Sequence, residues 1–436
     1  MKRVILLALL VTCASSAETR SLTILHTGDL HARMLPDDRG RGGFAYVAAV
    51  LRREKTGCGH CLHLDAGDLV MGTPVSTMFK GIPIYEIANR IAPDAFTLGN
   101  HDFDYGWQQV AEFRHTARFP VVSANVFGPE GKPVADATHT ILRVNGLRVG
   151  IIGAVMGDLR TGYLTARTAG PVRVEPVVES VRRIAREIAP VTDVIVVLGH
   201  ILPSEGAAVV REVPEVHVVV EGHSHRGLAE MDQVDGRVRV GVRGYGVEVG
   251  RLDLEVDTTA RKLRSAKWTR LPVDSAALEP APDVDELVRE WEQRVSAVVD
   301  QPVAEARRDF EPPDVLKLIE QAMREEMRAD FAAMNRGGVR DRLPKGMVRE
   351  RAIWNIMPFD NLMMTARVKG SEVPRPLSRG ATLDPQKEYV IALHDFSVGN
   401  EALRRELGIE RISFTSTGRL LRQLLIDWVR KKKILE

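Results

Sequence analysis

The sequence of 436 residues has three cysteines, a formal net charge of only +2 and no internal repeat or low-complexity tract. Two of the cysteines, Cys58 and Cys61, are too few to form a structural zinc site by themselves, because such sites need four ligands. The small net charge gives no reason to expect a nucleic acid polymer or an anionic membrane as the main partner. No segment, including the apolar run near the N-terminus, approaches the ~20 consecutive apolar residues of a membrane-spanning helix. These absences leave a globular chain that is long enough for two domains.

Residues 1–17 are typical of an export signal. Lys2 and Arg3 precede the apolar run Val4–Val11, and Ala14–Ala17 ends like a signal cleavage site. We therefore predict a signal peptide cut after residue 17 and an exported protein, periplasmic or secreted. Lipid attachment at Cys13 is an alternative, although the signal would then be very short.

Cleavage would leave Cys58 and Cys61 in an oxidising compartment, where disulfides persist. A redox-active C-x-x-C pair has its first cysteine at a helix N-terminus. Here the pair leads into the apolar stretch Leu62–Leu64, which we expect to be a strand. The sequence therefore predicts a local structural disulfide.

Short β-branched runs alternate with amphipathic stretches between Ser21 and about Pro272. The predicted strands are Leu22–His26, Leu62–Leu64, Ala95–Leu98, Val149–Ile152, Val194–Leu198 and Val216–Val220. Together with helical periodicity such as that of Val177–Ile188, this pattern is typical of βαβ units and of layered α/β packing. The alternating pattern of Val238–Val256 predicts an antiparallel meander that closes the region.

A stretch rich in proline and alanine, Asp274–Pro282, ends this region. Asp283 and Glu286 then resemble a capping box that begins a helix. The expected apolar face of this helix consists of Leu287, Trp291, Val295 and Val298. We predict a first domain over residues 21–273, a linker and bridging helix over 274–301, and a smaller second domain over 302–436. The second domain is expected to close with a helix near Gly418–Lys431.

Five short segments combine glycine with Asp, Asn or His, and each follows a predicted strand. They are Gly28–His31, Gly67–Asp68, Gly99–Asp102, Gly199–His200 and Gly222–His225. Because loops converge at the carboxyl ends of the strands in an open α/β sheet, we expect these side chains to meet. Carboxylate, imidazole and amide ligands without a thiolate suit Zn, Mn, Fe or Co better than calcium. The number of ligands suits two ions, which together can bind a phosphate, activate water and stabilise an in-line displacement.

The order of these segments, D-x-H, G-D, G-N-H-[DE], G-H and G-H-x-H, resembles that of the calcineurin-like metallophosphoesterases. Ile24–His31, Leu64–Asp68, Gly99–Asp104 and Gly72–Pro74 are similar to the exported 5′-nucleotidase branch of this superfamily. The resemblance implies an α/β fold with a catalytic domain built as a four-layer β-sandwich flanked by helices. It also implies a second, smaller α/β substrate domain, a shortened form of the 5′-nucleotidase C-terminal domain.

The same resemblance implies roles for individual residues. One metal would be held by Asp29, His31, Asp68 and His225, and the other by Asp68, Asn100, His200 and His223, so that Asp68 bridges them. His101 would contact the phosphate and the leaving-group oxygen, and Asp104 would orient its imidazole. Asp102 receives no role from the sequence.

In the second domain, Asn335–Arg340 and Pro358–Asn361 resemble the family's substrate-binding motifs. The residues that would line a nucleoside pocket are Asn335, Gly338, Arg340, Phe359, Asn361 and Phe396. A guanidinium can neutralise a phosphate and aromatic faces can sandwich a base, although a turn at the glycines or core roles for the rings stay open. After Phe396, the family's G-G-D-G run is replaced by Gly399–Ala402, so the aspartate that would bind a ribose hydroxyl has no clear counterpart.

These patterns predict a two-metal phosphoesterase that hydrolyses nucleoside 5′-monophosphates or related nucleotides in nucleotide catabolism. The substrate would be a small-molecule phosphate ester, attacked by a metal-activated hydroxide while His101 stabilises the departing group. Cyclic nucleotides, nucleotide sugars or a sulfur-containing analogue are alternative substrates. A periplasmic protein that binds metal without catalysis is a second alternative, and the complete His101–Asp104 pair argues against it.

Overall fold

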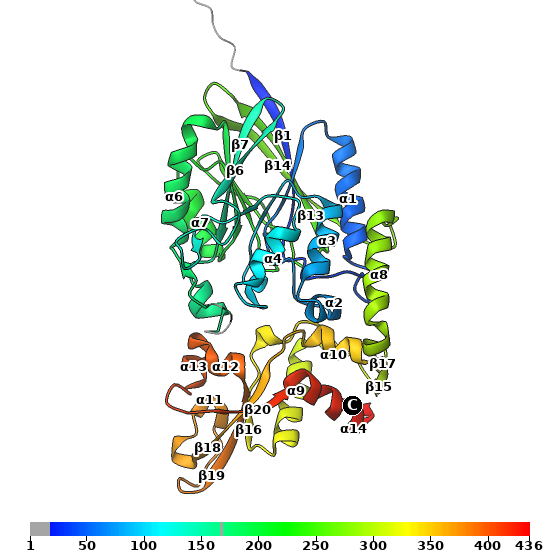
Figure 1. Cartoon of the computed structure of the whole chain (residues 1–436). Helices are drawn as coiled ribbons and strands as arrows, with labels where there is room; N and C mark the ends of the chain where they lie inside the picture. The colour runs from blue at the N-terminus through cyan, green and yellow to red at the C-terminus, as the bar shows by residue number, and fades with distance from the viewer. Residues whose placement is uncertain (1–17, 166–167, 169) are drawn as a thin grey trace, which may run out of the picture.

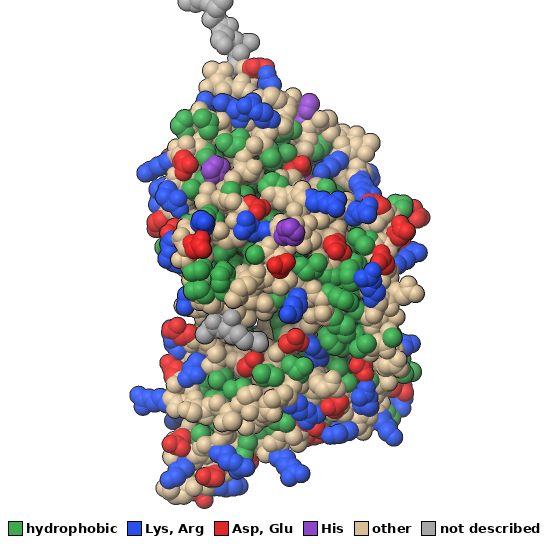
Figure 2. Space-filling view, viewed as in Figure 1, with side chains coloured by type: hydrophobic (Ala, Val, Ile, Leu, Met, Phe, Trp, Pro, Cys, Tyr) green, Lys and Arg blue, Asp and Glu red, His purple; other side chains and the backbone are tan. Residues whose placement is uncertain are grey.

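The computed structural model describes residues 18–165, 168 and 170–436 (Figure 1). The predicted signal peptide and Cys13 lie outside the described residues. Among the helices of the described part, none combines the length and the apolar character needed to cross a membrane. On the face shown in Figure 2, basic and acidic side chains are interspersed, which agrees with the formal net charge of +2.

Two six-stranded sheets form the upper part of the molecule in Figure 1. The first has the order β14-β13-β1-β2-β3-β4, with β1 (Thr19–Thr27), β2 (Cys61–Asp65), β3 (Ala95–Thr97), β4 (Val121–Val122), β13 (Glu248–Asp257) and β14 (Lys262–Pro272). The second has the order β11-β12-β10-β9-β7-β6, with β6 (His139–Val144), β7 (Leu147–Val155), β9 (Val194–His200), β10 (Val218–Glu221), β11 (Asp232–Val234) and β12 (Arg237–Val240). Each predicted strand overlaps one of these.

The predicted meander over Val238–Val256 is wrong. Its first strand, β12, pairs in parallel with β10 of the second sheet, whereas β13 pairs antiparallel with β1 and β14 of the first. The turn around Tyr245, whose φ is 64°, lies between these strands of different sheets. Alternating residues identify a strand but do not say which sheet it joins.

The two sheets pack face to face as a sandwich. Their shared core contains Leu22 and Leu252 from the first sheet and Val149, Val196 and Val218 from the second. The helices α6 (Val177–Ile188) and α7 (Pro203–Glu212) cover the outer face of the second sheet. On the outer side of the first sheet lie α1 (Phe44–Gly57), α2 (Pro74–Met78), α3 (Ile82–Ile91) and α4 (Gln109–Thr116) (Figure 1). This four-layer arrangement confirms the expected fold class.

Helix α8 (Pro282–Val299) connects the upper and lower parts (Figure 1). It packs against α1, α2 and α3 above and α10 (Glu350–Ile356) below. The predicted capping box is wrong, because the helix begins at Pro282 without a side-chain cap and Asp283 instead pairs with Arg52 of α1 at 2.9 Å. Val298 is 51% exposed, so it does not share the buried face of Val288 and Val295.

The lower part contains two smaller sheets. One has the order β17-β15-β21, with β15 (Pro302–Ala306), β17 (Gly346–Arg349) and β21 (Ile434–Leu435). The other has the order β16-β19-β18-β20, with β16 (Phe331–Ala332), β18 (Leu362–Lys369), β19 (Glu388–His394) and β20 (Thr415–Leu420). The helices of this part are α9 (Pro312–Met327), α10, α11 (Arg375–Ser378), α12 (Asp395–Gly399), α13 (Glu401–Leu407) and α14 (Leu421–Lys432). Helix α14 is the predicted C-terminal helix.

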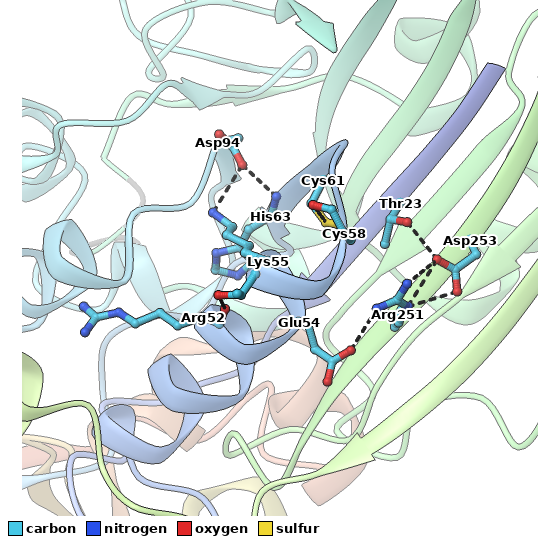
Figure 3. The surroundings of a disulfide bond; sticks show 11 residues. Thr23, Arg52, Glu54, Lys55, Cys58, Cys61, His63, Asp94, Arg251 and Asp253 are labelled. Atoms are coloured by element: carbon cyan, nitrogen blue, oxygen red, sulfur yellow. Dashed lines mark hydrogen bonds and ion pairs between the residues drawn. A yellow bond between two sulfur atoms is a disulfide. The ribbon is translucent and has the colours of Figure 1, made fainter. Parts of the chain in front are cut away.

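Cys58 and Cys61 form the predicted disulfide (Figure 3). It joins the residue after α1 to the first residue of β2, with the two Cα atoms 6.1 Å apart. Two ion pairs hold the same end of α1: Lys55 lies 3.6 Å from Asp94, and Glu54 lies 2.9 Å from Arg251. The disulfide therefore ties a helix end to the strand whose other end leads to Asp68.

Candidate metal centre and substrate cleft

The five ligand segments lie at the carboxyl ends of strands from both sheets. Three follow β1, β2 and β3 of the first sheet, and two follow or end β9 and β10 of the second. His31 and His225, which are 194 positions apart in the sequence, have their Nε2 atoms 2.9 Å apart. Ligand atoms of Asp29, His31, Asp68 and His225 all lie within 4.8 Å of one another. The ligand segments of the two sheets therefore meet in one place.

The backbone of these segments has an uncommon conformation. Positive φ values occur at Asp29 (53°), His31 (46°), Asp68 (56°), His223 (76°) and His225 (56°). Each costs on the order of 1–2 kcal/mol for a residue with a side chain. Hydrogen bonds between the loops hold them, because the N–H of Asp29 donates to Gly67 O at 2.8 Å and that of His31 to Asp68 O at 2.9 Å.

Asp68 lies between two groups of predicted ligands. Its Oδ2 is 3.6 Å from His31 Nε2 and 3.1 Å from His200 Nε2. The other close pairs are His225 Nε2 to Asp29 Oδ1 (3.3 Å), Asn100 Oδ1 to His200 Nε2 (3.2 Å) and Asn100 Oδ1 to His223 Nδ1 (3.1 Å). The structure therefore brings all seven predicted ligands into one cluster around Asp68.

The protonation states of this cluster suit a divalent cation. Burial lowers the pKa of His225 to about 2 and lowers the pKa of His31 well below its usual value. Both imidazoles are therefore neutral, and each has a nitrogen without a proton. The guanidinium of Arg340 donates to His31 Nε2 at 3.1 Å, so a cation already lies beside the cluster. Neutral imidazoles next to carboxylates are a donor set that fits a divalent metal.

Negative charge is crowded in the same place. Burial raises the pKa of Asp29 to about 7, and the neighbouring Asp68 carboxylate contributes to the increase. Burial opposes protonation of His200, but the carboxylates of Asp68 and Asp29 outweigh it and raise the pKa of His200 to about 9. A divalent ion would neutralise the carboxylates of Asp29 and Asp68, whose negative charge is otherwise balanced by the His200 imidazolium.

His101 and Asp104 form a pair beside the cluster. His101 Nδ1 is 2.6 Å from Asp104 Oδ2, and the backbone N–H of His101 donates to Asp68 Oδ1 at 2.8 Å. The imidazole stacks against the Phe359 ring, with 5.7 Å between the ring centroids. The hydrogen bond between His101 Nδ1 and the Asp104 carboxylate fixes the orientation of the imidazole and places a proton on Nδ1. Nε2 is therefore the nitrogen that can contact a substrate.

Two buried carboxylates of this region receive no role from the sequence. Asp102 Oδ2 accepts the N–H groups of Gly99 at 2.7 Å and of Asp68 at 3.2 Å. Asp65 accepts the Thr27 hydroxyl at 2.6 Å and the Gly67 N–H at 3.1 Å. Both therefore fix the turns on which Asp68 and Asn100 sit. An acidic residue beside a ligand motif is the signal that could have indicated them.

A cleft of about 590 Å³ lies between the upper and lower parts of the molecule. From the first domain it is lined by Asp68, Asn100, His101, Asp104, Tyr163, His223 and His225, among others. All six residues predicted to bind substrate also line it: Asn335, Gly338, Arg340, Phe359, Asn361 and Phe396. Leu403 and Met71 add apolar surface. The predicted substrate residues, the His101–Asp104 pair and four of the seven predicted ligands therefore face one space, whereas Asp29, His31 and His200 are not among its lining residues.

Polar contacts fasten the two parts together at the edges of this cleft. Arg340, Asp341 and Arg342 are consecutive, and each contacts the loop that follows β1. The partners are His31 for Arg340 (3.1 Å), Arg33 for Asp341 (3.1 Å) and Asp38 for Arg342 (3.0 Å). Elsewhere, the Thr77 hydroxyl donates to Pro358 O at 2.9 Å.

Comparisons with known proteins agree with this architecture. The family model of the calcineurin-like phosphoesterases matches residues 22–227, and that of the 5′-nucleotidase C-terminal domain matches residues 295–379. The chain is 27% identical over 394 residues to endonuclease YhcR of Bacillus subtilis, covering 81% of this chain and 32% of that protein. It is 22% identical over 525 residues to protein UshA of Yersinia enterocolitica, covering 96% and 92%. The chain thus spans about a third of the first relative and nearly all of the second.

Among solved structures, the chain is similar to the 5′-nucleotidase precursor of Thermus thermophilus. The TM-score is 0.87 at 25% sequence identity, and the match covers 96% of this chain and 97% of the other. The similarity therefore extends over both domains.

Proposed function

We propose that this chain, which belongs to the calcineurin-like phosphoesterases that carry a 5′-nucleotidase C-terminal domain, hydrolyses nucleoside 5′-monophosphates or related phosphate esters. The observation that supports this best is the common cleft, where a buried Asp/His/Asn cluster and the His101–Asp104 pair face the predicted substrate motifs. In this proposal residues 21–273 form the catalytic domain, 274–301 the linker and bridging helix, and 302–436 the substrate domain.

In this reaction the seven clustered side chains would hold two divalent ions, with Zn and Mn as the leading candidates. One site would consist of Asp29, His31, Asp68 and His225, and the other of Asp68, Asn100, His200 and His223. Ions bound there would supply an activated water and neutralise the phosphate. His101 contacts and stabilises the leaving-group oxygen through Nε2, and Asp104 keeps its imidazole oriented.

The second domain binds the rest of the substrate. The Arg340 guanidinium lies 6.0 Å from the centre of the Phe359 ring, so charge and an aromatic face are presented together. Phe359 and Phe396 line the same cleft, and its volume of about 590 Å³ is in the range that accommodates a small ligand. Asn400, within the segment that replaces the family's G-G-D-G run, is fully buried and donates to Gly162 O at 2.9 Å. Nucleotide recognition therefore depends on the base and the phosphate more than on the ribose.

The protein is proposed to act outside the cytoplasm on small phosphate esters. Two features support this: the export signal predicted over residues 1–17, and the disulfide between Cys58 and Cys61, which persists in oxidising compartments.

A direct test uses the mature chain with Mn²⁺ or Zn²⁺ and identifies by chromatography the hydrolysis products of AMP, cyclic AMP, UDP-glucose and an aryl phosphate. We expect AMP to be hydrolysed fastest and Asn100→Ala to lose bound metal. If the aryl phosphate alone is hydrolysed, the nucleotide assignment is wrong while the centre stands. If no ester is hydrolysed and Asn100→Ala keeps the metal content of the wild type, the two-metal proposal fails.

A further inference from the structure

We propose that Tyr163 is a positioning residue that fixes the tautomer of His223, and that Asn400 of the second domain holds Tyr163 in place. The inference rests on the proposed two-metal centre and extends it to two residues to which the family's motifs give no role. It means that the substrate domain is connected by hydrogen bonds to a metal ligand of the catalytic domain.

The contact between Tyr163 and His223 is direct. Tyr163 is the last residue of η2 (Leu159–Tyr163), a single π-helical turn that lines the cleft. Its hydroxyl lies 3.0 Å from His223 Nε2, and the two rings meet edge to face with 4.8 Å between their centroids. Single π-helical turns occur frequently at functional sites.

The position of Asn100 decides which nitrogen of His223 would bind the metal. His223 Nδ1 lies 3.1 Å from Asn100 Oδ1, which is another predicted ligand, so Nδ1 faces the centre. A neutral imidazole has one proton, and a coordinating nitrogen must lack it. With Nε2–H donating to the Tyr163 hydroxyl, the proton stays on Nε2 and Nδ1 keeps its lone pair.

His200 has the same arrangement with its nitrogens exchanged. Its Nδ1 donates to Ala66 O at 2.8 Å, and its Nε2 faces Asp68 and Asn100. Each imidazole of this half of the centre therefore has an outer acceptor. For His200 the acceptor is a backbone carbonyl, whereas for His223 it is the Tyr163 side chain, which a substitution can remove.

Asn400 connects this tyrosine to the second domain. Its Nδ2 donates to Gly162 O at 2.9 Å and to Thr161 O at 3.4 Å, the two carbonyls directly before Tyr163. Its Oδ1 accepts the Leu403 N–H at 3.0 Å and so caps helix α13. Because Asn400 is fully buried and uses both ends of its amide, a movement of α13 would also move the segment that carries Tyr163.

The first test is Tyr163→Phe, which keeps the ring and removes the hydroxyl. Mn²⁺ is titrated calorimetrically into the metal-free mature chain. We expect one of the two Mn²⁺ sites to bind about 10–100-fold more weakly, because loss of an outer partner of a ligand has effects of this size. Saturating Mn²⁺ should restore kcat, which it would not do if the fold were damaged. The control is Tyr389→Phe, whose hydroxyl accepts the Asp384 N–H at 3.2 Å in the second domain.

The second test is Asn400→Asp, which keeps the acceptor that caps α13 but removes the donor to the two carbonyls. It should weaken the same Mn²⁺ site, and combining it with Tyr163→Phe should add little further loss, because both act through one hydrogen bond. Asn145→Asp removes a comparable donor, to Ser21 O at 2.9 Å, away from the cleft, and should leave Mn²⁺ binding unchanged.

The outcomes separate this inference from the proposed function. If the wild type binds two Mn²⁺ and Tyr163→Phe gives the same titration, Tyr163 has no positioning role while the metal centre stands. If Tyr163→Phe weakens binding but Asn400→Asp does not, the connection to the second domain is refuted. A wild type that binds no Mn²⁺ overturns both the function and the inference.

Discussion

Asp102 offers a sharp test of how the metal centre is held, because its carboxylate contacts the backbone of two ligand loops and no predicted ligand side chain. Its Oδ2 accepts the N–H groups of Gly99 and Asp68, and the Tyr85 hydroxyl lies 3.4 Å from its Oδ1. The side chain is fully buried. Asp102→Ala therefore removes the acceptor of two backbone N–H groups that water cannot reach.

The size of the effect follows from these contacts. A buried donor left without an acceptor costs about 1–3 kcal/mol, so two of them cost roughly 4 kcal/mol. For a domain of this size, each kcal/mol lowers the Tm by about 2–4 °C, which gives a decrease of about 8–16 °C. Asp102→Asn keeps an acceptor oxygen and the shape of the side chain. Because burial raises the pKa of Asp102 to about 7, a neutral side chain is tolerated there and the expected decrease is below about 4 °C.

The assay is calorimetric unfolding of the metal-free protein, so that lost metal does not add to the effect. Asp136→Ala is a suitable control, since its exposed carboxylate accepts the Val121 N–H at 3.1 Å. That variant should lose no more than about 4 °C. The reasoning is refuted if Asp102→Ala and Asp102→Asn lower the Tm equally, or if Asp102→Ala lowers it by less than the control.

Four further predictions concern the reaction and the fold. Asp104→Asn should lower kcat by about 100-fold with an unchanged Mn²⁺ affinity, and equal losses of both would contradict its role as partner of His101. Arg342→Gln removes contacts to Asp38 and Glu311 that are together worth roughly 1 kcal/mol. The KM should therefore rise about 5-fold at low salt, and the difference from the wild type should vanish at high salt, which screens the ion pairs. A change in kcat alone would contradict this. Metal is first removed from the protein with EDTA, and Mn²⁺ is then added to 100 times its Kd. The Tm of the Mn²⁺-loaded protein should be about 5–10 °C above that of the metal-free protein, and an unchanged Tm would argue against a metal site in the folded state. Replacing Cys58 and Cys61 by serine opens a short loop, so the protein should lose about 2 kcal/mol, measured by calorimetry, while activity at 25 °C is retained.

The convergence of the five ligand segments could be predicted because each follows a strand. The place of Asp68 between two groups of predicted ligands was implied by the resemblance of their order to the family pattern, and their binding of metal stays a prediction. Asp102, Tyr163 and Asn400 could not be assigned in the same way, because their roles consist of contacts to backbone atoms or side chains of distant loops. Asn400 in particular acquires its role only when α13 lies against the segment before Tyr163. Similarly, the residues after Val238 indicated strands but not the two different sheets that receive them.

The origin of the ligands in two sheets also bears on the order of folding. His31 follows a strand of the first sheet and His225 a strand of the second, with 194 positions between them. Contacts over such separations form slowly, because the entropy lost on closing the long intervening loop opposes them. In a partly folded chain, an ion can therefore bind separate imidazoles but not the complete set of ligands. In the proposed two-metal centre, tight metal binding would require a closed sandwich, and the ion would then link the two sheets at the end where their loops meet.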